Sequence, residues 1–266
     1  MIGVDRGRLA PVAEVSVGGW IADRLGTFGG SVGSVAPRGF EAYARVLHPV
    51  SDGDRSNVRW AEVCASTGRR PHALMQWHAI AGVVETRTET RTGTRTTRTM
   101  LWPGDAPWVG NLDGDTLVPL CQVLAQHARQ DEECFFALWE GYGWVHGSPA
   151  IAVLGSTDLI PPAFPPEVID GPRLQHPGRD YILFSGPLMA ALEMGDRTVD
   201  WFSPQSPNLF WPASRAWCVV TEIDFDSTIV AGSSELIAAV LAEPALEAWP
   251  VEQDDSLAHD GDTLNT

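Results

Sequence analysis

Lysine is absent from this sequence, and all 18 basic side chains are arginine. Enzymes that form a Schiff base, anchor pyridoxal phosphate or bind a nucleotide through a Walker A motif need a lysine, so these classes are excluded. The four cysteines include no Cys-x-x-Cys pair, and the seven histidines include no His-x-x-x-His pair. A common zinc pattern is therefore missing. No apolar run approaches the roughly 18 residues of a membrane helix, and the first residues lack the apolar core of a signal peptide.

The chain has 266 residues, of which 44% are hydrophobic, and this is enough to bury a core. We expect one domain over residues 1–266. Each cysteine lies in an apolar segment, which suits buried, reduced thiols. With no export or membrane signal, the expected location is cytoplasmic.

Charge is unevenly distributed along the chain. Residues 1–100 hold 13 Arg against 9 acidic residues, whereas residues 101–266 hold 5 Arg against 25, and the net charge is −16. A surface of this sign repels the phosphates of nucleic acid, so we predict neither nucleic acid nor membrane as a partner. A basic protein is the partner that this charge favours.

Residues 86–99, TRTETRTGTRTTRT, form a low-complexity tract of arginine and threonine. Threonine forms helices poorly and the tract has no apolar face, so we predict a mobile, solvated loop or an extended excursion inserted in the domain. A small phosphate-binding arm is the functional alternative. At the other end of the chain, the acidic and polar residues 252–266 predict a frayed tail.

Hydrophobic periodicity and capping residues predict the secondary structure. Helices are expected at residues 57–68, 115–130 and 233–243. Buried strands are expected at residues 39–50, 134–144, 180–187 and 216–226. Strands that occur both singly between helices and in a near-meander favour the α+β class, with a mostly antiparallel sheet and helices packed on one face.

The segment WCVVTEIDFDSTIV, residues 217–230, resembles the start of the haloacid dehalogenase-like phosphatases, in which an apolar strand leads into Asp-x-Asp-Ser-Thr. The resemblance implies Asp224 as nucleophile, Asp226 as general acid/base and a Mg²⁺ ion between them. We expect it to be coincidental, because no lysine or arginine follows Arg215 to hold a phosphate. The 40 residues after Asp226 are also too few for the parallel sheet of that fold.

In a strand over residues 216–226, side chains alternate between two faces. The apolar row is expected in the core, and it consists of Trp217, Val219, Thr221, Ile223 and Phe225. The opposite row then presents Glu222, Asp224 and Asp226 at steps of about 6.6 to 7 Å, since a strand rises about 3.3 Å per residue. Such a row either contributes to a Mg²⁺ or Ca²⁺ site that other elements complete, or stays a solvated face paired with Arg179 or Arg215.

Aromatic residues gather in two loop-like regions rich in glycine and proline, EGYGWVHG and DWFSPQSPNLFWP. The candidate binding residues among and beside them are Trp139, Tyr142, Trp144 and Trp211. Their rings offer large rigid faces with one polar atom each, so the cluster can line a groove for a sugar, a peptide or a planar ligand. The competing interpretation is that these rings cover the core.

Several segments, among them PRGFEAYARVLHPV, PGRDYILFSGPL and the closing DGDTLN, are similar to those of a family of uncharacterised proteins common in high-GC actinobacteria. The resemblance covers most of residues 27–264. It implies an origin and no particular activity.

The leading hypothesis from the sequence is a non-catalytic binding or protein-interaction module without a cofactor. Its recognition surface would combine the aromatic groove with the carboxylate face. The alternative is a metal-dependent hydrolase that uses Glu222, Asp224 and Asp226 with Mg²⁺ or Ca²⁺.

Overall fold

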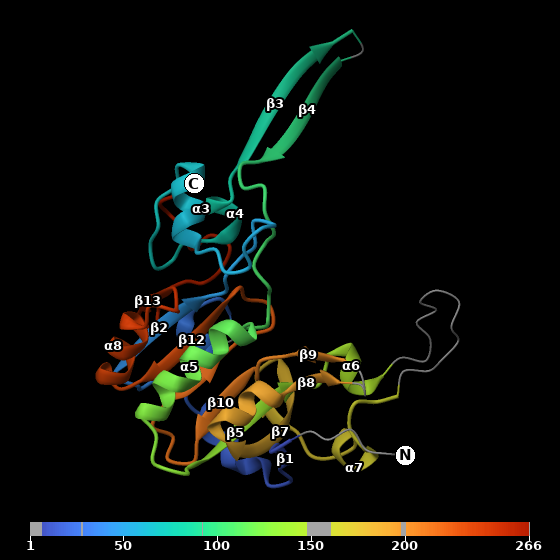
Figure 1. Cartoon of the computed structure of the whole chain (residues 1–266), viewed down its shortest axis with the longest axis vertical. Helices are drawn as coiled ribbons and strands as arrows, with labels where there is room; N and C mark the ends of the chain where they lie inside the picture. The colour runs from blue at the N-terminus through green and yellow to red at the C-terminus, as the bar shows by residue number, and fades with distance from the viewer. Residues whose placement is uncertain (1–6, 28, 92, 148–160, 198–200, 266) are drawn as a thin grey trace.

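The computed structural model describes residues 7–27, 29–91, 93–147, 161–197 and 201–265. Figure 1 shows a body built around one large sheet, with a long hairpin projecting from one end. Every strand pairing in the described residues is antiparallel, and several helices pack on the sheet. The predicted α+β class is therefore confirmed. The assignment of residues 1–266 to a single domain stays a prediction.

Within the described residues, nine strands form the central sheet. Their spatial order is β1 (Ala10–Pro11), β7 (Arg179–Pro187), β5 (Glu133–Trp139), β10 (Leu209–Pro212), β11 (Cys218–Val220), β12 (Ser227–Gly232), β2 (Ala42–Leu47) and β13 (Ala248–Val251), with β6 (Leu174–His176) beside β7. Three consecutive strands, β10 to β12, lie between β5 and β2, which come from earlier in the chain. The sheet thus brings segments far apart in the sequence side by side.

One face of the sheet carries the two longest helices, α5 (Gly114–Gln126) and α8 (Ser234–Ala242), with the 3-10 helix η2 (Leu188–Glu193). Helix α5 begins where the Asp113 carboxylate accepts the Thr116 N–H at 3.0 Å, and it buries the apolar side chains of Leu117, Leu120, Cys121 and Leu124. Helix α8 begins after Ser233, whose Oγ accepts the Leu236 N–H. Both helices cover Trp217 and its neighbours on the sheet.

The opposite face of the sheet is covered as well. The 3-10 helix η1 (Val15–Gly18) and the short helices α1 (Gly19–Ala22) and α2 (Val32–Val35) pack on it. Trp217, which precedes β11, and Val219 within it face the α5 side, whereas Cys218 and Val220 face the α1 side. The sheet is therefore a middle layer that is buried on both sides.

A third apolar cluster lies at the end of the body from which the hairpin projects. It contains α3 (Trp60–Thr67) and α4 (Trp77–Ile80). Helix α3 begins later than its predicted cap, Asn57, because the Glu247 carboxylate accepts the N–H groups of Trp60 and Ala61 at 2.5 and 2.9 Å. It ends, as predicted, at Gly68, whose φ of 73° favours glycine.

The remaining elements are short or lie apart from the sheet. They are α6 (Gly143–His146), α7 (Pro166–Ile169), the hairpin of β8 (Gly195–Arg197) and β9 (Phe202–Pro204), and the projecting hairpin of β3 (Val83–Thr90) and β4 (Gly93–Met100). Of the two forms predicted for residues 86–99, the structure shows the extended one. Thr86 lies opposite Thr97 and Arg87 opposite Thr96, a pairing that suits β-branched threonine.

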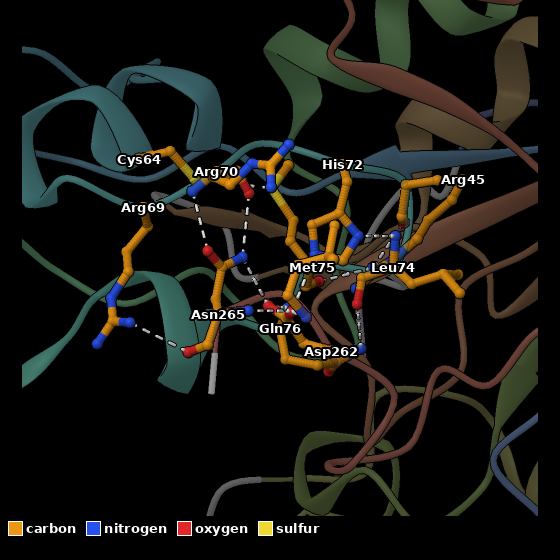
Figure 2. A network of polar contacts seen from close by, with 12 residues as sticks. Arg45, Cys64, Arg69, Arg70, His72, Leu74, Met75, Gln76, Asp262 and Asn265 are labelled. Atoms are coloured by element: carbon orange, nitrogen blue, oxygen red, sulfur yellow. Dashed lines mark hydrogen bonds and ion pairs between the residues drawn. The ribbon is translucent and has the colours of Figure 1, made fainter.

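The C-terminal tail is not frayed, so this prediction was wrong. Asp262 and Asn265 are buried, and Figure 2 shows them bonded to the segment that joins α3 to α4. The Asp262 carboxylate accepts hydrogen bonds from His72 Nε2 at 2.9 Å and from the Gln76 N–H at 3.3 Å. Asn265 Oδ1 accepts the Arg70 N–H at 2.9 Å. Polar composition predicts fraying only where the polar groups have no partners, and here they have them.

Cys64, Cys121, Cys134 and Cys218 are free and buried, as predicted. Burial raises the pKa of these thiols, that of Cys64 to about 11. Among the described residues, no helix combines the length and the apolar character that crossing a membrane requires.

Candidate binding groove

The three candidate carboxylates do not lie along a strand. Strand β11 ends at Val220, and residues 221–226 form the turn to β12, in which the Phe225 N–H bonds to the Glu222 carbonyl at 3.1 Å. The alternation predicted over residues 216–226 holds as far as Val220 and fails beyond it. Ile223 and Phe225 are consequently half-buried at the edge of the body, not core residues.

Glu222 and Asp224 share one cation, Arg179 of β7. Arg179 Nη2 lies 2.8 Å from Glu222 Oε1 and 2.6 Å from Asp224 Oδ2. The same guanidinium group lies over the Trp139 ring, 6.0 Å from its centroid. Burial raises the pKa of Glu222, which is 7% exposed, and outweighs the attraction of Arg179. The Asp224 side chain is 71% exposed, so its contact with Arg179 stabilises little.

Asp226 belongs to a different network. Its Oδ1 lies 3.4 Å from Nη2 of Arg45, a side chain that is only 1% exposed. Arg45 also donates to the carbonyls of Ala73 and Met75 at 3.1 and 2.8 Å. Burial lowers the pKa of Arg45 and raises that of Asp226.

The carboxylates are therefore divided between two arginines. Of the two alternatives left open by the sequence, the structure shows the arginine-paired one for Glu222 and Asp224, with Arg179 as the partner. Arg215 lies instead over the Trp20 ring, 5.5 Å from its centroid. In the part of the chain that the structure describes, no three His, Cys, Asp or Glu side chains are arranged to hold a metal ion.

Three of the four predicted aromatic residues lie together, and the fourth does not. The Tyr142 ring centroid is 5.2 Å from that of Trp139 and 6.2 Å from that of Trp144. Trp211 is fully buried in the cluster on the α1 side of the sheet, where it contacts Trp20. The assignment of Trp211 to a binding surface was therefore wrong, because β10 is an inner strand with both faces covered.

The Tyr142 hydroxyl fixes a loop that connects β4 to α5. It donates to the Gly110 carbonyl at 3.1 Å and accepts from Asn208 Nδ2 and Gln205 Nε2 at 3.0 and 3.1 Å. Gly110 has a φ of 72°, and the Ile223 backbone lies so close that a Cβ atom would meet it at 2.6 Å. Tyr142 thus positions this loop and does not itself present a free polar atom.

A buried histidine fixes the same loop from the core. His48 Nδ1 lies 2.5 Å from the Trp108 carbonyl, and Nε2 lies 3.0 Å from Thr228 Oγ1. Because a carbonyl only accepts, Nδ1 carries the proton and Nε2 accepts from the threonine. Burial lowers the pKa of His48 to about 4, so the ring is neutral at pH 7. The Trp108 carbonyl is held by the core, although the residue as a whole is 61% exposed.

Trp108 stands between two hollows, which we call together the Trp108 groove. The first has a volume of about 490 Å³, and its lining includes Trp108, Trp144, Trp201, Asn111 and Asp196. The second has a volume of about 340 Å³, and its lining includes Trp108, Asn111, Asp105, Asp113 and Asp115. Since both hollows share Trp108 and Asn111, they flank one exposed indole ring.

The groove is acidic. Asp113 caps α5, but the carboxylates of Asp105, Asp115 and Asp196 make no hydrogen bond or ion pair with the described residues. No arginine lines either hollow in the described part of the chain.

Sequence reasoning missed Trp108 and Asp196, and it placed Trp201 only in the wider aromatic cluster. Trp108 lies in WPGDAPWVGN, a stretch of turn-forming residues without helical or strand periodicity. A large apolar residue in such a stretch belongs to no predicted helix or strand that would carry its side chain into the core. This is the signal that could have found Trp108.

A comparison with protein families, curated proteins and solved structures gives no significant match for this chain. The resemblance to actinobacterial proteins stays a prediction.

Proposed function

We propose that this protein is a non-catalytic binding module that holds a basic partner in the Trp108 groove. The observation that carries this proposal is the combination, in one groove, of exposed tryptophans with carboxylates that have no partner among the described residues. Trp108 is 61% exposed and Trp201 is 53% exposed, although both are large apolar side chains. Exposed aromatic rings that line a hollow are typical of binding surfaces.

Tryptophan and carboxylate together select for a cation. An arginine or lysine side chain over an indole face gains about 0.5 to 2 kcal/mol, and the larger values belong to contacts that exclude water. Asp196 lies in the same hollow as Trp108, Trp144 and Trp201, so one guanidinium group can stack on an indole and pair with the carboxylate. Asp105 and Asp115 offer the same pairing on the other side of Trp108.

The loop that carries Trp108 is fixed before any partner arrives. His48 holds the Trp108 carbonyl, and Tyr142 and Gln205 hold the Gly110 carbonyl. A fixed loop loses less conformational entropy on binding, so more of the contact energy appears as affinity. The net charge of −16 also attracts a basic partner from a distance, and this attraction falls as salt is added.

The cytoplasm stays the proposed location, because buried, free thiols persist in a reducing compartment. The hydrolase hypothesis receives no support from the carboxylates, since Glu222 and Asp224 contact Arg179 while Asp226 contacts Arg45. We therefore propose no second function.

Titration with short peptides tests the proposal. A peptide with several arginines should change the tryptophan emission and bind in calorimetry, and a matched peptide with glutamate in place of arginine should not. Trp108→Ala and Asp196→Asn should each weaken the binding about tenfold, which corresponds to roughly 1.4 kcal/mol. Trp108→Ala leaves the backbone contact with His48 in place.

Asp23→Asn is the matched control, because Asp23 is exposed, lies in the cap of α1 and is absent from the groove lining. It removes the same unit of charge and should leave the affinity within about twofold. Equal weakening by Asp23→Asn would reduce the effect to net charge and refute a specific groove. Equal binding of the glutamate peptide would refute the selection for cations.

A further inference from the structure

The projecting hairpin of β3 and β4, which we call the arm, is the most unusual element of the fold. Figure 1 shows it extending away from the body, and its strands pair with each other and with no other described strand. With eight residues in each strand, its length is about 27 Å. An isolated two-stranded hairpin is at best marginally stable in water, and its outer edges invite a partner.

The arm differs in charge from the rest of the molecule. Residues 83–100 contain four arginines and two glutamates, a net charge of +2, whereas the whole chain carries −16 and the remainder therefore −18. Arg87 and Arg95 occupy adjacent positions of the ladder, Arg87 opposite Thr96 and Thr88 opposite Arg95. Alternation then places these two arginines on opposite faces of the arm. Arg87, Arg91 and Arg95 are all exposed.

We infer that the arm of one copy of this chain docks in the Trp108 groove of a second copy. This inference rests on the proposed function and names its basic partner. The arm supplies exposed arginines, and the groove supplies exposed indoles with the carboxylates of Asp105, Asp115 and Asp196, which have no partner in the part of the chain that the structure describes. Charge complementarity of this kind fixes both the partner and the register of an interface.

The arm does not fill the groove of its own chain, because it extends away from the body. Exchange between two copies solves this problem, since each arm reaches the partner's groove and a two-fold arrangement closes the contact. Duplex nucleic acid would also attract the arginines of the arm. The charge of −18 on the rest of the chain disfavours nucleic acid as the partner, because the phosphates would repel the body whenever the arm brought it close to the duplex.

Sedimentation velocity of the full chain is the first measurement. At low ionic strength the chain should sediment as a dimer, and high salt should dissociate it. The arm variant, Arg87→Glu with Arg91→Glu and Arg95→Glu, should weaken the dimer at least tenfold. The groove variant, Asp105→Asn with Asp115→Asn and Asp196→Asn, should do the same, whereas the control Asp23→Asn with Asp54→Asn and Asp260→Asn should not.

Mixing provides the decisive comparison. The arm variant keeps an intact groove and the groove variant keeps an intact arm, so their mixture should form a heterodimer that neither forms alone. A mixture that stays monomeric, or a wild-type chain that is monomeric at low salt, overturns the inference. A third result also overturns it in favour of nucleic acid. In that result the wild-type chain stays monomeric and binds duplex DNA, and the arm variant loses the DNA binding.

The failure of this inference can be told apart from the failure of the proposed function. The arginine peptide is titrated into the arm variant, whose groove is unchanged. Binding of the peptide by a chain that never dimerises refutes the arm as the partner and leaves the basic-ligand groove in place. Absence of peptide binding, together with a dimer that is insensitive to the groove variant, refutes both.

Discussion

Asp262 offers the sharpest test of how the C-terminal tail is held. Its two carboxylate oxygens accept from His72, from Asn265 Nδ2 at 2.9 Å, and from the N–H groups of Gln76, Leu264 and Asn265. Burial opposes ionisation, but the hydrogen bonds from Asn265 and His72 outweigh it and lower the pKa of Asp262 from 3.8 to about 2. The charged form is therefore the one that the fold stabilises.

The variant Asp262→Asn replaces one accepting oxygen with an NH₂ group that faces donors. We expect a loss of about 2 to 4 kcal/mol in the free energy of unfolding at pH 7, because hydrogen bonds to a charged acceptor contribute about 1.5 to 3 kcal/mol each and stranded donors add a penalty. The depressed pKa alone corresponds to about 2 kcal/mol. Asp260→Asn is the matched control, since Asp260 is exposed two residues away.

The sign of the pH dependence follows from the direction of the shift. A lowered carboxyl pKa contributes stability above the unfolded-state value near 3.8, and this contribution disappears as the pH falls toward about 2. In urea unfolding, the difference between wild type and Asp262→Asn should be complete at pH 7 and about half as large at pH 3. A difference below about 0.5 kcal/mol at pH 7, or one that does not change with pH, would refute the assigned network.

Three further predictions follow from burial. Asp224→Asn should change the free energy of unfolding by less than about 1 kcal/mol, because its contact with Arg179 is exposed; a Mg²⁺-dependent phosphatase activity that this variant abolishes would contradict the non-catalytic proposal. Trp211→Ala should cost about 3 to 5 kcal/mol in urea unfolding, whereas the half-buried Phe225→Ala should cost about 1 to 2 kcal/mol, and similar costs would show that Phe225 is core after all. Replacing residues 86–99 with a short Gly/Ser linker should leave the melting temperature within about 2 °C, since the arm is exposed and its strands pair with no other described strand; a larger loss would show that the arm packs on the body.

Elements with strong local signals were predictable from the sequence. Helix α5 has an apolar stripe at helical spacing and an aspartate that caps it, and α8 has a serine cap and a terminal proline. Strand β7 was predicted within one residue at its start and to the residue at its end. In each case the local pattern predicts both the element and its buried face, so the prediction does not require knowledge of tertiary contacts.

Features that depend on distant partners were not predictable. The tail is ordered because Asp262 meets His72 and Gln76, which are about two hundred residues earlier in the chain. The run AWCVVTEIDFD looks like one strand, yet it turns after Val220, where the Thr221 N–H bonds to the Asn208 carbonyl and the Gly110 N–H bonds to the Phe225 carbonyl. Polar residues in an alternating pattern could equally have continued the strand.

The groove shows why composition alone cannot separate a binding tryptophan from a core tryptophan. Trp211 is surrounded because β10 is an inner strand, whereas Trp108 follows a proline in a loop whose backbone is tied to the core at His48 and Gly110. The Trp108 ring stays exposed in the groove, beside carboxylates that also lack partners among the described residues. An exposed indole costs solubility in a free monomer, and a net charge of −16 offsets that cost. In the function that we propose, a basic surface covers the groove and with it the indole.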